Sequence, residues 1–247
     1  MDLGLKGRTA LVCGASSGLG LASAEALAAE GANVTMFARR RDELERQADR
    51  IGALAVRGDV TLPQDTERAV ATTLEAFGGL DILVWNHGGP PPGGATDVTP
   101  DAVEQAVELM VQPAIRLVTA ARPHLERSAG GRIIAITSLA AKEPTAHLAL
   151  SNMFRPAISA WLKTLADELG PHGITANCVA PGRIATARLE QLYPEGPTPE
   201  QVAQIPLRRW GEPKEFGDVV CFIASERARY ISGQTIVVDG GLQRALF

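Results

Sequence analysis

Seven short apolar runs, rich in β-branched residues, alternate with longer amphipathic stretches along almost the whole chain. Apolar runs of this kind are typical of strands covered on both faces, and their regular alternation with helices predicts a parallel sheet. The predicted strands are 9–13, 33–38, 53–57, 82–85, 132–137, 175–179 and 235–238, and the predicted helices are 19–30, 41–50, 63–77, 100–125, 152–169 and 213–224. The pattern therefore predicts an α/β fold with a doubly wound parallel sheet of about seven strands and helices on both faces.

No linker or block of charge interrupts this alternation before residue 238. We therefore expect residues 1–247 to form a single domain of the Rossmann type. Two stretches look irregular: 87–94, with three prolines and four glycines, and 183–199, with three prolines. Both follow predicted strands, and loops in that position line the ligand crevice of an open parallel sheet.

Composition narrows the classes of partner. The formal net charge of −4 gives no electrostatic reason to expect nucleic acid or an anionic membrane surface. Cys13, Cys178 and Cys221 lie far apart, with no histidine nearby at ligand spacing, which argues against a disulfide framework and a metal site. No secretory signal is visible, and no segment approaches the roughly 20 apolar residues of a membrane span. We expect a cytoplasmic protein that binds neither nucleic acid nor membrane and holds no metal.

A glycine-rich turn joins the first strand to the first helix. It reads Gly14-Ala15-Ser16-Ser17-Gly18-Leu19-Gly20. Glycines in this position let the backbone approach a pyrophosphate, whose charge the helix N-terminus then favours. A glycine pattern alone is weak, but this one stands in the strand–turn–helix context that the chemistry requires. It predicts a bound dinucleotide.

The end of the second strand indicates which dinucleotide binds. An acidic side chain there would hydrogen-bond the ribose 2′-hydroxyl of NAD. The sequence instead continues Ala38-Arg39-Arg40-Arg41, and a guanidinium suits a 2′-phosphate. We select Arg39 as the phosphate partner, with Ser17 adding a hydroxyl, and assign Arg40 and Arg41 to the solvated start of the next helix. NADP(H) is favoured over NAD(H).

Further motifs extend along the chain. Gly58-Asp59-Val60, Trp85-Asn86-His87-Gly88 and Pro181-Gly182-Arg183-Ile184-Ala185-Thr186 follow the third, fourth and sixth predicted strands. With the glycine turn they resemble the short-chain dehydrogenase/reductase family along nearly the whole chain, and most of all its 3-oxoacyl-carrier-protein reductases. In that family Asp59 would meet the adenine amine, and Thr186 would hold the nicotinamide amide. The cofactor-binding residues predicted on these grounds are Gly14, Ser16, Ser17, Gly18, Leu19, Gly20, Arg39, Asp59, Val60, Asn86, Gly88, Arg155, Pro181, Gly182, Ile184 and Thr186.

The resemblance breaks at the catalytic residues. The family uses a serine, a tyrosine thirteen residues later and a lysine four further on, helped by an asparagine upstream. Ser138 matches the serine, whereas Ser151 occupies the tyrosine position, Arg155 the lysine position and Met110 the asparagine position. A guanidinium stays protonated and cannot relay a proton, and an aliphatic alcohol is a much weaker acid than a phenol. We still predict Ser138, Ser151 and Arg155 as the catalytic set.

Other groups could supply the missing acid. The candidates are His147, His87 and Tyr193. Their alternative roles are a surface position for each histidine and a packing role for Tyr193. Pro113 interrupts the predicted helix 100–125, so it should kink that helix and free the carbonyl of Leu109, which we expect to bind the water that the missing asparagine would have held.

The sequence leaves three functions open. The first is an NADP(H)-dependent oxidoreductase that acts on a small-molecule carbonyl or secondary alcohol with an atypical acid–base set. The second is a catalytically silent NADP(H)-binding sensor or scaffold, and a distant third is a lyase or epimerase that uses the same pocket. The family resemblance implies a homotetramer that uses helices 100–125 and 152–169, and a homodimer is the alternative.

Overall fold

Seven parallel strands form the centre of the molecule. The computed structural model describes residues 1–246, with strands β1 (Thr9–Cys13), β2 (Asn33–Ala38), β3 (Leu54–Arg57), β4 (Ile82–Trp85), β5 (Arg132–Ile136), β6 (Thr175–Pro181) and β7 (Thr235–Val238). They pair in the order β3-β2-β1-β4-β5-β6-β7, so the chain reverses its direction of winding between β1 and β4. The predicted doubly wound sheet of seven strands is confirmed, and its ligand crevice is expected at this reversal.

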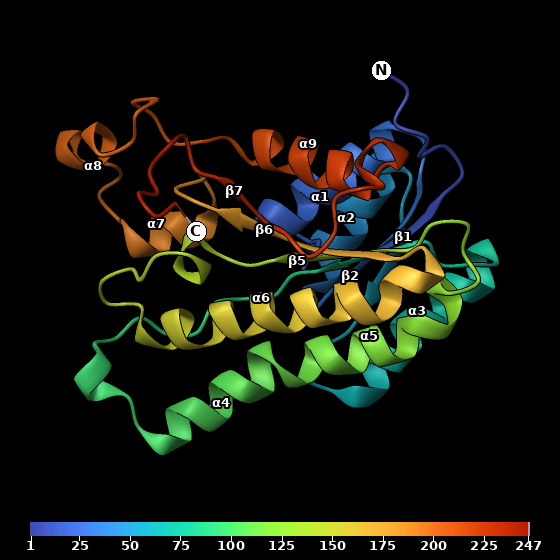
Figure 1. Cartoon of the computed structure of the whole chain (residues 1–247), viewed down its shortest axis with the longest axis horizontal. Helices are drawn as coiled ribbons and strands as arrows, with labels where there is room; N and C mark the ends of the chain where they lie inside the picture. Colours follow the sequence, from blue (N-terminus) through green and yellow to red (C-terminus); the bar gives the residue numbers. More distant parts are fainter. Residues whose placement is uncertain (247) are drawn as a thin grey trace.

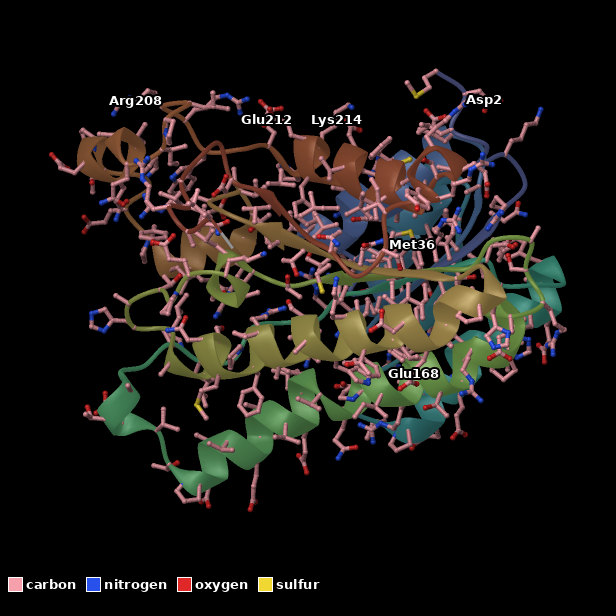
Figure 2. All side chains as sticks on the ribbon, in the orientation of Figure 1. Asp2, Met36, Glu168, Arg208, Glu212 and Lys214 are labelled. Atoms are coloured by element: carbon pink, nitrogen blue, oxygen red, sulfur yellow. The ribbon has the colours of Figure 1, made fainter. Side chains whose placement is uncertain are left out.

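Helices cover both faces of the sheet (Figure 1). One layer contains α1 (Gly18–Ala29), α2 (Arg41–Ile51) and α9 (Pro213–Ala224), and the opposite layer contains α3 (Pro63–Phe77), α4 (Pro100–Met110), α5 (Gln112–Leu125) and α6 (Ala149–Leu169). Side chains of each strand alternate between the two layers, as a pleated strand requires. Ala10 and Val12 of β1 enter the core under α1 and α9, whereas Leu11 and Cys13 enter the core under α5 and α6. In Figure 2 the side chain of Met36 points into the densely filled interior, while Glu212 and Lys214 lie at the outer surface.

The predicted helix 100–125 is divided in two. α4 ends at Met110, and α5 begins at Gln112 with Pro113 in its first turn. Proline has no N–H to donate to the carbonyl of Leu109, which explains why the helix breaks here. The break that Pro113 predicts is therefore present, and Figure 1 shows α4 and α5 following one another beside α6.

A short helix, α7 (Ala187–Leu192), lies in the stretch 183–199 that the sequence suggests is irregular, and a second, α8 (Pro199–Ala203), begins at its last residue. Threonines cap both helices. Thr186 Oγ1 accepts from the Leu189 N–H at 3.4 Å, and Thr198 forms a capping box with Gln201. We call residues 183–205 the lid. In addition, α6 begins three residues before the predicted 152.

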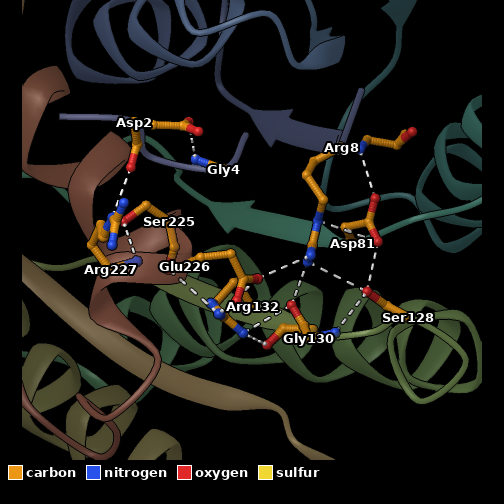
Figure 3. A network of polar contacts seen from close by, with 12 residues as sticks. Asp2, Gly4, Arg8, Asp81, Ser128, Gly130, Arg132, Ser225, Glu226 and Arg227 are labelled. Carbon is orange, nitrogen blue, oxygen red and sulfur yellow. Dashed lines mark hydrogen bonds and ion pairs between the residues drawn. The ribbon is translucent and has the colours of Figure 1, made fainter. Parts of the chain in front are cut away.

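A polar network ties together the amino edge of the sheet (Figure 3). Arg132, which is 1% exposed, lies 3.4 Å from Glu226, and Arg8 contacts the same carboxylate at 3.2 Å. Asp81 accepts from the Thr9 N–H at 2.8 Å and from the Ser128 hydroxyl at 2.6 Å. The network joins the starts of β1, β4 and β5 to the segment after α9. Along residues 1–246 no helix is both long and apolar enough to cross a membrane.

Candidate functional site

The glycine turn lies at the carboxyl end of β1, where the winding of the sheet reverses. Gly14 and Gly18 adopt positive φ values of 61° and 59°. A Cβ atom on Gly20 would collide with the Gly14 carbonyl, and one on Gly14 would lie 2.6 Å from Asn86 Nδ2. Ser17 occupies the N-cap position of α1 but its side chain makes no capping bond, so the first N–H groups of the helix are left for a ligand. The turn therefore fits a pyrophosphate, as the dinucleotide hypothesis requires.

Two consecutive arginines after β2 point to different partners. Arg39 Nη1 lies 3.7 Å from Asp59 Oδ2, and its side chain is largely exposed. Arg40 Nη2 donates to Ser17 Oγ at 2.7 Å and to Ser16 Oγ at 3.3 Å. The sequence assigns Arg40 to the solvated start of the next helix. The residue is exposed and occupies the N-cap position of α2, as that assignment expects. Its guanidinium, however, lies against the glycine turn.

A surface pocket of about 330 Å³ lies beside these arginines. Arg39, Arg57, Arg68 and Asp59 contribute to its lining. Asp59 also accepts from the Thr61 N–H and hydroxyl, which fixes its carboxylate. The lining of the pocket also includes a second carboxylate, that of Asp65. Three guanidiniums and two carboxylates around one pocket are suited to an adenosine phosphate. Val60 packs at the edge of the adjacent core.

The loop after β6 approaches the glycine turn from the opposite side. Pro181 ends β6, Gly182 and Ile184 follow, and Thr186 caps α7. A Cβ atom on Gly18 would lie 3.7 Å from Thr186 Cγ2, so the turn and the loop are in van der Waals reach. The segments predicted to hold the pyrophosphate and the nicotinamide are therefore neighbours.

Ser151 and Arg155 face the carboxyl end of β5 from the first turns of α6. They are 8% and 7% exposed, and their spacing of four residues places them on one side of the helix. Arg155 Nη1 donates to the Ile136 carbonyl at 3.0 Å. Ser138 begins the loop after β5, where its hydroxyl accepts from the Ala140 N–H at 3.2 Å. Both strand end and helix start thus contribute to the predicted catalytic set.

Arg155 is a buried cation with few partners. Burial, followed by the nearby Arg188 guanidinium, lowers the pKa of Arg155 to about 10. Its Nε atom is buried without a hydrogen bond. At neutral pH the group remains charged, because that pKa is still well above 7. Arg155 can therefore hold a hydroxyl or an anion but cannot release a proton.

The three candidate acids occupy different environments. His87 is buried, stacks on Trp85 with ring centroids 5.1 Å apart, and directs Nδ1 at the Gly88 carbonyl. Burial, and then Arg155, hold its pKa well below its usual range. His147 is exposed and has a positive φ of 58°. Tyr193 lies in the lid, 6.0 Å from the ring of Trp210 and 5.8 Å below the guanidinium of Arg183. Of these three candidates, only His87 is buried.

An apolar pocket of about 270 Å³ lies next to this site. Pro90–Gly94, together with Leu109, Ala149 and Leu150, form much of its lining. The predicted catalytic residues Ser138, Ser151 and Arg155 do not line it. Backbone bonds from Gly93 N to His147 O and from Ala149 N to Gly93 O brace its wall. Met110, at the family's asparagine position, is fully buried nearby at the end of α4.

Sequence reasoning missed three arginines that lie near predicted site residues. Arg57 and Arg68 line the pocket that contains Arg39 and Asp59, and Arg188 reaches from α7 to the Pro90 carbonyl at 2.9 Å. Arg57 ends β3, and its place beside Gly58-Asp59 could have marked it. No local signal marks Arg188, because its partner is 98 residues away. Among residues 1–246 no group of three or more His, Cys, Asp or Glu side chains is arranged to hold a metal ion.

Known proteins share this fold and these motifs. A family model described as enoyl-(acyl carrier protein) reductase matches residues 14–243. The dehydrogenase/reductase SDR family member 4 of Oryctolagus cuniculus is 35% identical over 244 residues, 96% of this chain and 94% of that protein. The crystal structure of L-sorbose reductase from Gluconobacter frateurii, complexed with NADPH and L-sorbose, superposes with a TM-score of 0.89 at 31% identity and full coverage of both chains. The 3-ketoacyl-(acyl-carrier-protein) reductase of Brucella melitensis, complexed with NADH, has the same TM-score at 30% identity, covering 96% of this chain and 99% of that one.

Each of these similarities covers nearly the whole chain, so each includes the glycine turn, the predicted catalytic residues and the lid. The relatives whose names state an activity act on carbonyl or alcohol groups with a nicotinamide cofactor. The chain belongs to the short-chain dehydrogenase/reductase family of NAD(P)-dependent oxidoreductases.

Proposed function

We propose that this protein is an NADP(H)-dependent oxidoreductase that acts on a carbonyl or secondary alcohol through an atypical acid–base set. The observation that carries the cofactor assignment is the placement of Arg39 and Arg40. Arg40 bonds to Ser17 in the glycine turn, and Arg39 lies beside Asp59, so two guanidiniums flank the expected position of the ribose. A 2′-phosphate would gain charge-assisted hydrogen bonds from both.

The nicotinamide would supply or accept the hydride, and the chain must orient the substrate and handle the proton. The Ser138 hydroxyl is available to donate to a carbonyl oxygen, since its recorded bond uses it as an acceptor. Arg155 would hold ribose hydroxyls, and Ser151 would stand beside the reacting carbon. Loss of the tyrosine removes general acid catalysis, typically worth about 10²–10⁴ in rate. Positioning alone still contributes on the order of 7–11 kcal/mol, so slow turnover is consistent with this site.

Binding of the two cofactors tests the assignment. We expect NADPH to bind more tightly than NADH in a fluorescence titration. Replacing Arg40 by glutamine (Arg40→Gln) should weaken NADPH about 10-fold or more, the typical effect of losing a hydrogen bond to a charged group, and leave NADH almost unchanged. The matched control is Arg46→Gln, an exposed arginine of α2 that pairs with Glu43. Equal affinity of the native protein for NADPH and NADH would refute the NADP(H) assignment.

A second function, a catalytically silent NADP(H) sensor or scaffold, is favoured by one observation. No phenol stands at the family's tyrosine position, which Ser151 occupies. Consumption of NADPH with a panel of aldehydes and ketones separates the two functions. Tight binding without turnover, restored by Ser151→Tyr together with Arg155→Lys, would support the silent protein. Assembly as a homotetramer, or alternatively a homodimer, and a cytoplasmic location stay predictions.

A further inference from the structure

The lid and the loop after β4 leave the sheet on either side of β5. The lid follows β6, and residues 87–94, which we call the β4 loop, follow β4; in the sheet, β5 lies between these two strands. Neighbouring strands are about 4.8 Å apart, so a contact between the two segments has to span about 10 Å at the carboxyl end of β5. The loop that begins with Ser138 leaves the sheet at this end. A side chain that joins the lid to the β4 loop therefore reaches across the strand end that carries Ser138.

Arg188 makes this contact. It is the second residue of α7, and its Nη2 donates to the Pro90 carbonyl at 2.9 Å. Among residues 1–246 this is the one hydrogen bond between the lid and the β4 loop. A Cβ atom on Gly89 would lie 3.1 Å from Nη2 and 3.4 Å from Nε, so the exposed guanidinium lies directly against the backbone of the loop. The contact therefore needs both a long cationic side chain and a loop residue that has no side chain.

The acceptor belongs to a braced segment. Pro90 is buried, and Gly93, three residues later, makes two backbone hydrogen bonds to the segment that leads into α6. Its N–H donates to the His147 carbonyl at 2.8 Å, and its carbonyl accepts from the Ala149 N–H at 3.2 Å. The β4 loop thus offers the lid an acceptor that is itself held in place.

The contact fixes the part of the lid that is predicted to touch the cofactor. Thr186, predicted to hold the nicotinamide amide, precedes Arg188 by two residues and caps α7 through the Leu189 N–H. It also faces the glycine turn, since a Cβ atom on Gly18 would lie 3.7 Å from its Cγ2. A helix of six residues is not stable alone, so the position of α7 depends on tertiary contacts. Loss of the bond to Pro90 should therefore loosen Thr186 from the glycine turn.

We propose that Arg188 is a positioning residue whose bond to Pro90 holds the first turn of α7 against the nicotinamide end of bound NADP(H) and slows release of the cofactor. This inference rests on the proposed function, because it requires NADP(H) to bind. A lid that is already in place lowers the ordering cost of binding. Arg39 and Arg40 are assigned to the other end of the cofactor, so a ligand that lacks the nicotinamide should be insensitive to Arg188.

Two ligands that share the adenosine end distinguish the two ends of the site. NADPH contains the nicotinamide, and adenosine 2′,5′-bisphosphate lacks it. We expect Arg188→Gln to release NADPH about 2- to 10-fold faster in stopped-flow displacement by excess NADP⁺, the range for loss of one hydrogen bond, and to leave the calorimetric Kd of the bisphosphate unchanged. Arg188→Lys keeps a cationic donor and should restore part of the slow release. Glu190→Gln, at an exposed residue two positions further along α7, is the control and should release NADPH as the native protein does.

Gly89→Ala tests the same contact from the opposite side. Its Cβ atom would displace the Arg188 guanidinium while leaving every charge unchanged. The variant should also speed the release of NADPH, and combining it with Arg188→Gln should add little, because both changes act on one contact. Fully additive effects on the release rate would overturn the inference, since the two residues would then act independently.

The remaining outcomes separate the inference from the proposed function. Unchanged release of NADPH from Arg188→Gln would overturn the inference and leave the cofactor assignment intact. A bisphosphate affinity weakened as much as the affinity for NADPH would also overturn it, because Arg188 would then support the whole site and not its nicotinamide end. Failure of the native protein to bind NADPH would instead remove the proposed function and the inference that rests on it.

Discussion

His87 shows how much the environment of a single residue matters at this site. The family resemblance places it where a small alanine is usual, and the structure buries it against Trp85. Because Nδ1 faces the Gly88 carbonyl, the neutral ring carries its proton there and leaves Nε2 as an acceptor. A neutral imidazole in this state would accept a proton during alcohol oxidation rather than donate one during carbonyl reduction.

Burial of His87 should make the stability of the protein depend on pH. Its pKa in the folded protein lies well below the value near 6.5 expected for the unfolded chain. As the pH falls below 6.5, the unfolded chain binds a proton that the folded protein does not, so the free energy of unfolding decreases, by at most about 1.4 kcal/mol per pH unit. His87→Gln should flatten this decrease between pH 7.5 and 5 in urea denaturation, whereas His147→Gln, at an exposed position, should follow the native protein. Parallel curves for the native protein and His87→Gln would contradict this prediction.

Predictability differs among the elements because different physical signals define them. The strands are buried on both faces, so their apolar runs are visible in the sequence, and four of the seven, β1, β2, β4 and β7, have the predicted bounds. The break at Pro113 follows from one missing N–H. The lid helices α7 and α8 are short and depend on caps at Thr186 and Thr198, so they give no periodic pattern. The early start of α6 coincides with backbone bonds to Gly93, which is far away in sequence.

The residues of the candidate site also divide into those that a local pattern locates and those that depend on distant contacts. The glycine turn, Ser138, Ser151, Arg155 and Thr186 stand at strand ends or helix starts, where local pattern and family motifs locate them. Arg40 and Arg188, whose contacts the sequence did not predict, act between segments that are distant in the chain. Arg40 reaches back 23 residues to Ser17, and Arg188 reaches 98 residues to Pro90. A local sequence pattern cannot predict contacts between residues so far apart in the chain.

The aromatic contacts of the lid give a prediction at the level of elements. Tyr193 makes a tilted contact with Trp210 and lies under the guanidinium of Arg183, which itself donates to Gln204 Oε1 at 2.7 Å. Such aromatic and cation–π contacts contribute about 0.5–1.5 kcal/mol each. Tyr193→Ala should therefore increase amide hydrogen exchange across α7 and α8 by about 5- to 150-fold, while Tyr193→Phe keeps the ring and should exchange as the native lid does. A loss of turnover in Tyr193→Phe with unchanged exchange would instead identify its hydroxyl as the relocated acid.

At the scale of the whole molecule, function and stability occupy opposite edges of one sheet. The carboxyl edge carries the glycine turn, the loops after β4, β5 and β6, and Arg155, which forms no ion pair within residues 1–246. The amino edge carries the network of Arg8, Asp81, Arg132 and Glu226, in which the buried cation is paired (Figure 3). The unpaired charge of Arg155 therefore lies at one end of the strands. The polar contacts that join β1, β4 and β5 lie at the other end. Substitutions at the two edges should therefore have nearly additive effects on stability.

The amino-edge network itself should account for a measurable part of the free energy of unfolding. Glu226→Gln removes the carboxylate that both Arg132 and Arg8 contact, and leaves the 1%-exposed Arg132 without a counterion. Breaking a fully buried pair typically costs about 3–5 kcal/mol. Because the Glu226 side chain is 41% exposed, we expect a smaller loss, on the order of 1–3 kcal/mol. The control is Asp218→Asn, which breaks the exposed pair with Lys214 on α9 and should cost about 0.3–0.5 kcal/mol.

Urea denaturation of the two variants measures the difference. If Glu226→Gln lost no more stability than Asp218→Asn, the network would be a surface feature that does not stabilise the sheet. NADPH affinity should be the same in both variants, because the network and the glycine turn lie at opposite ends of the strands.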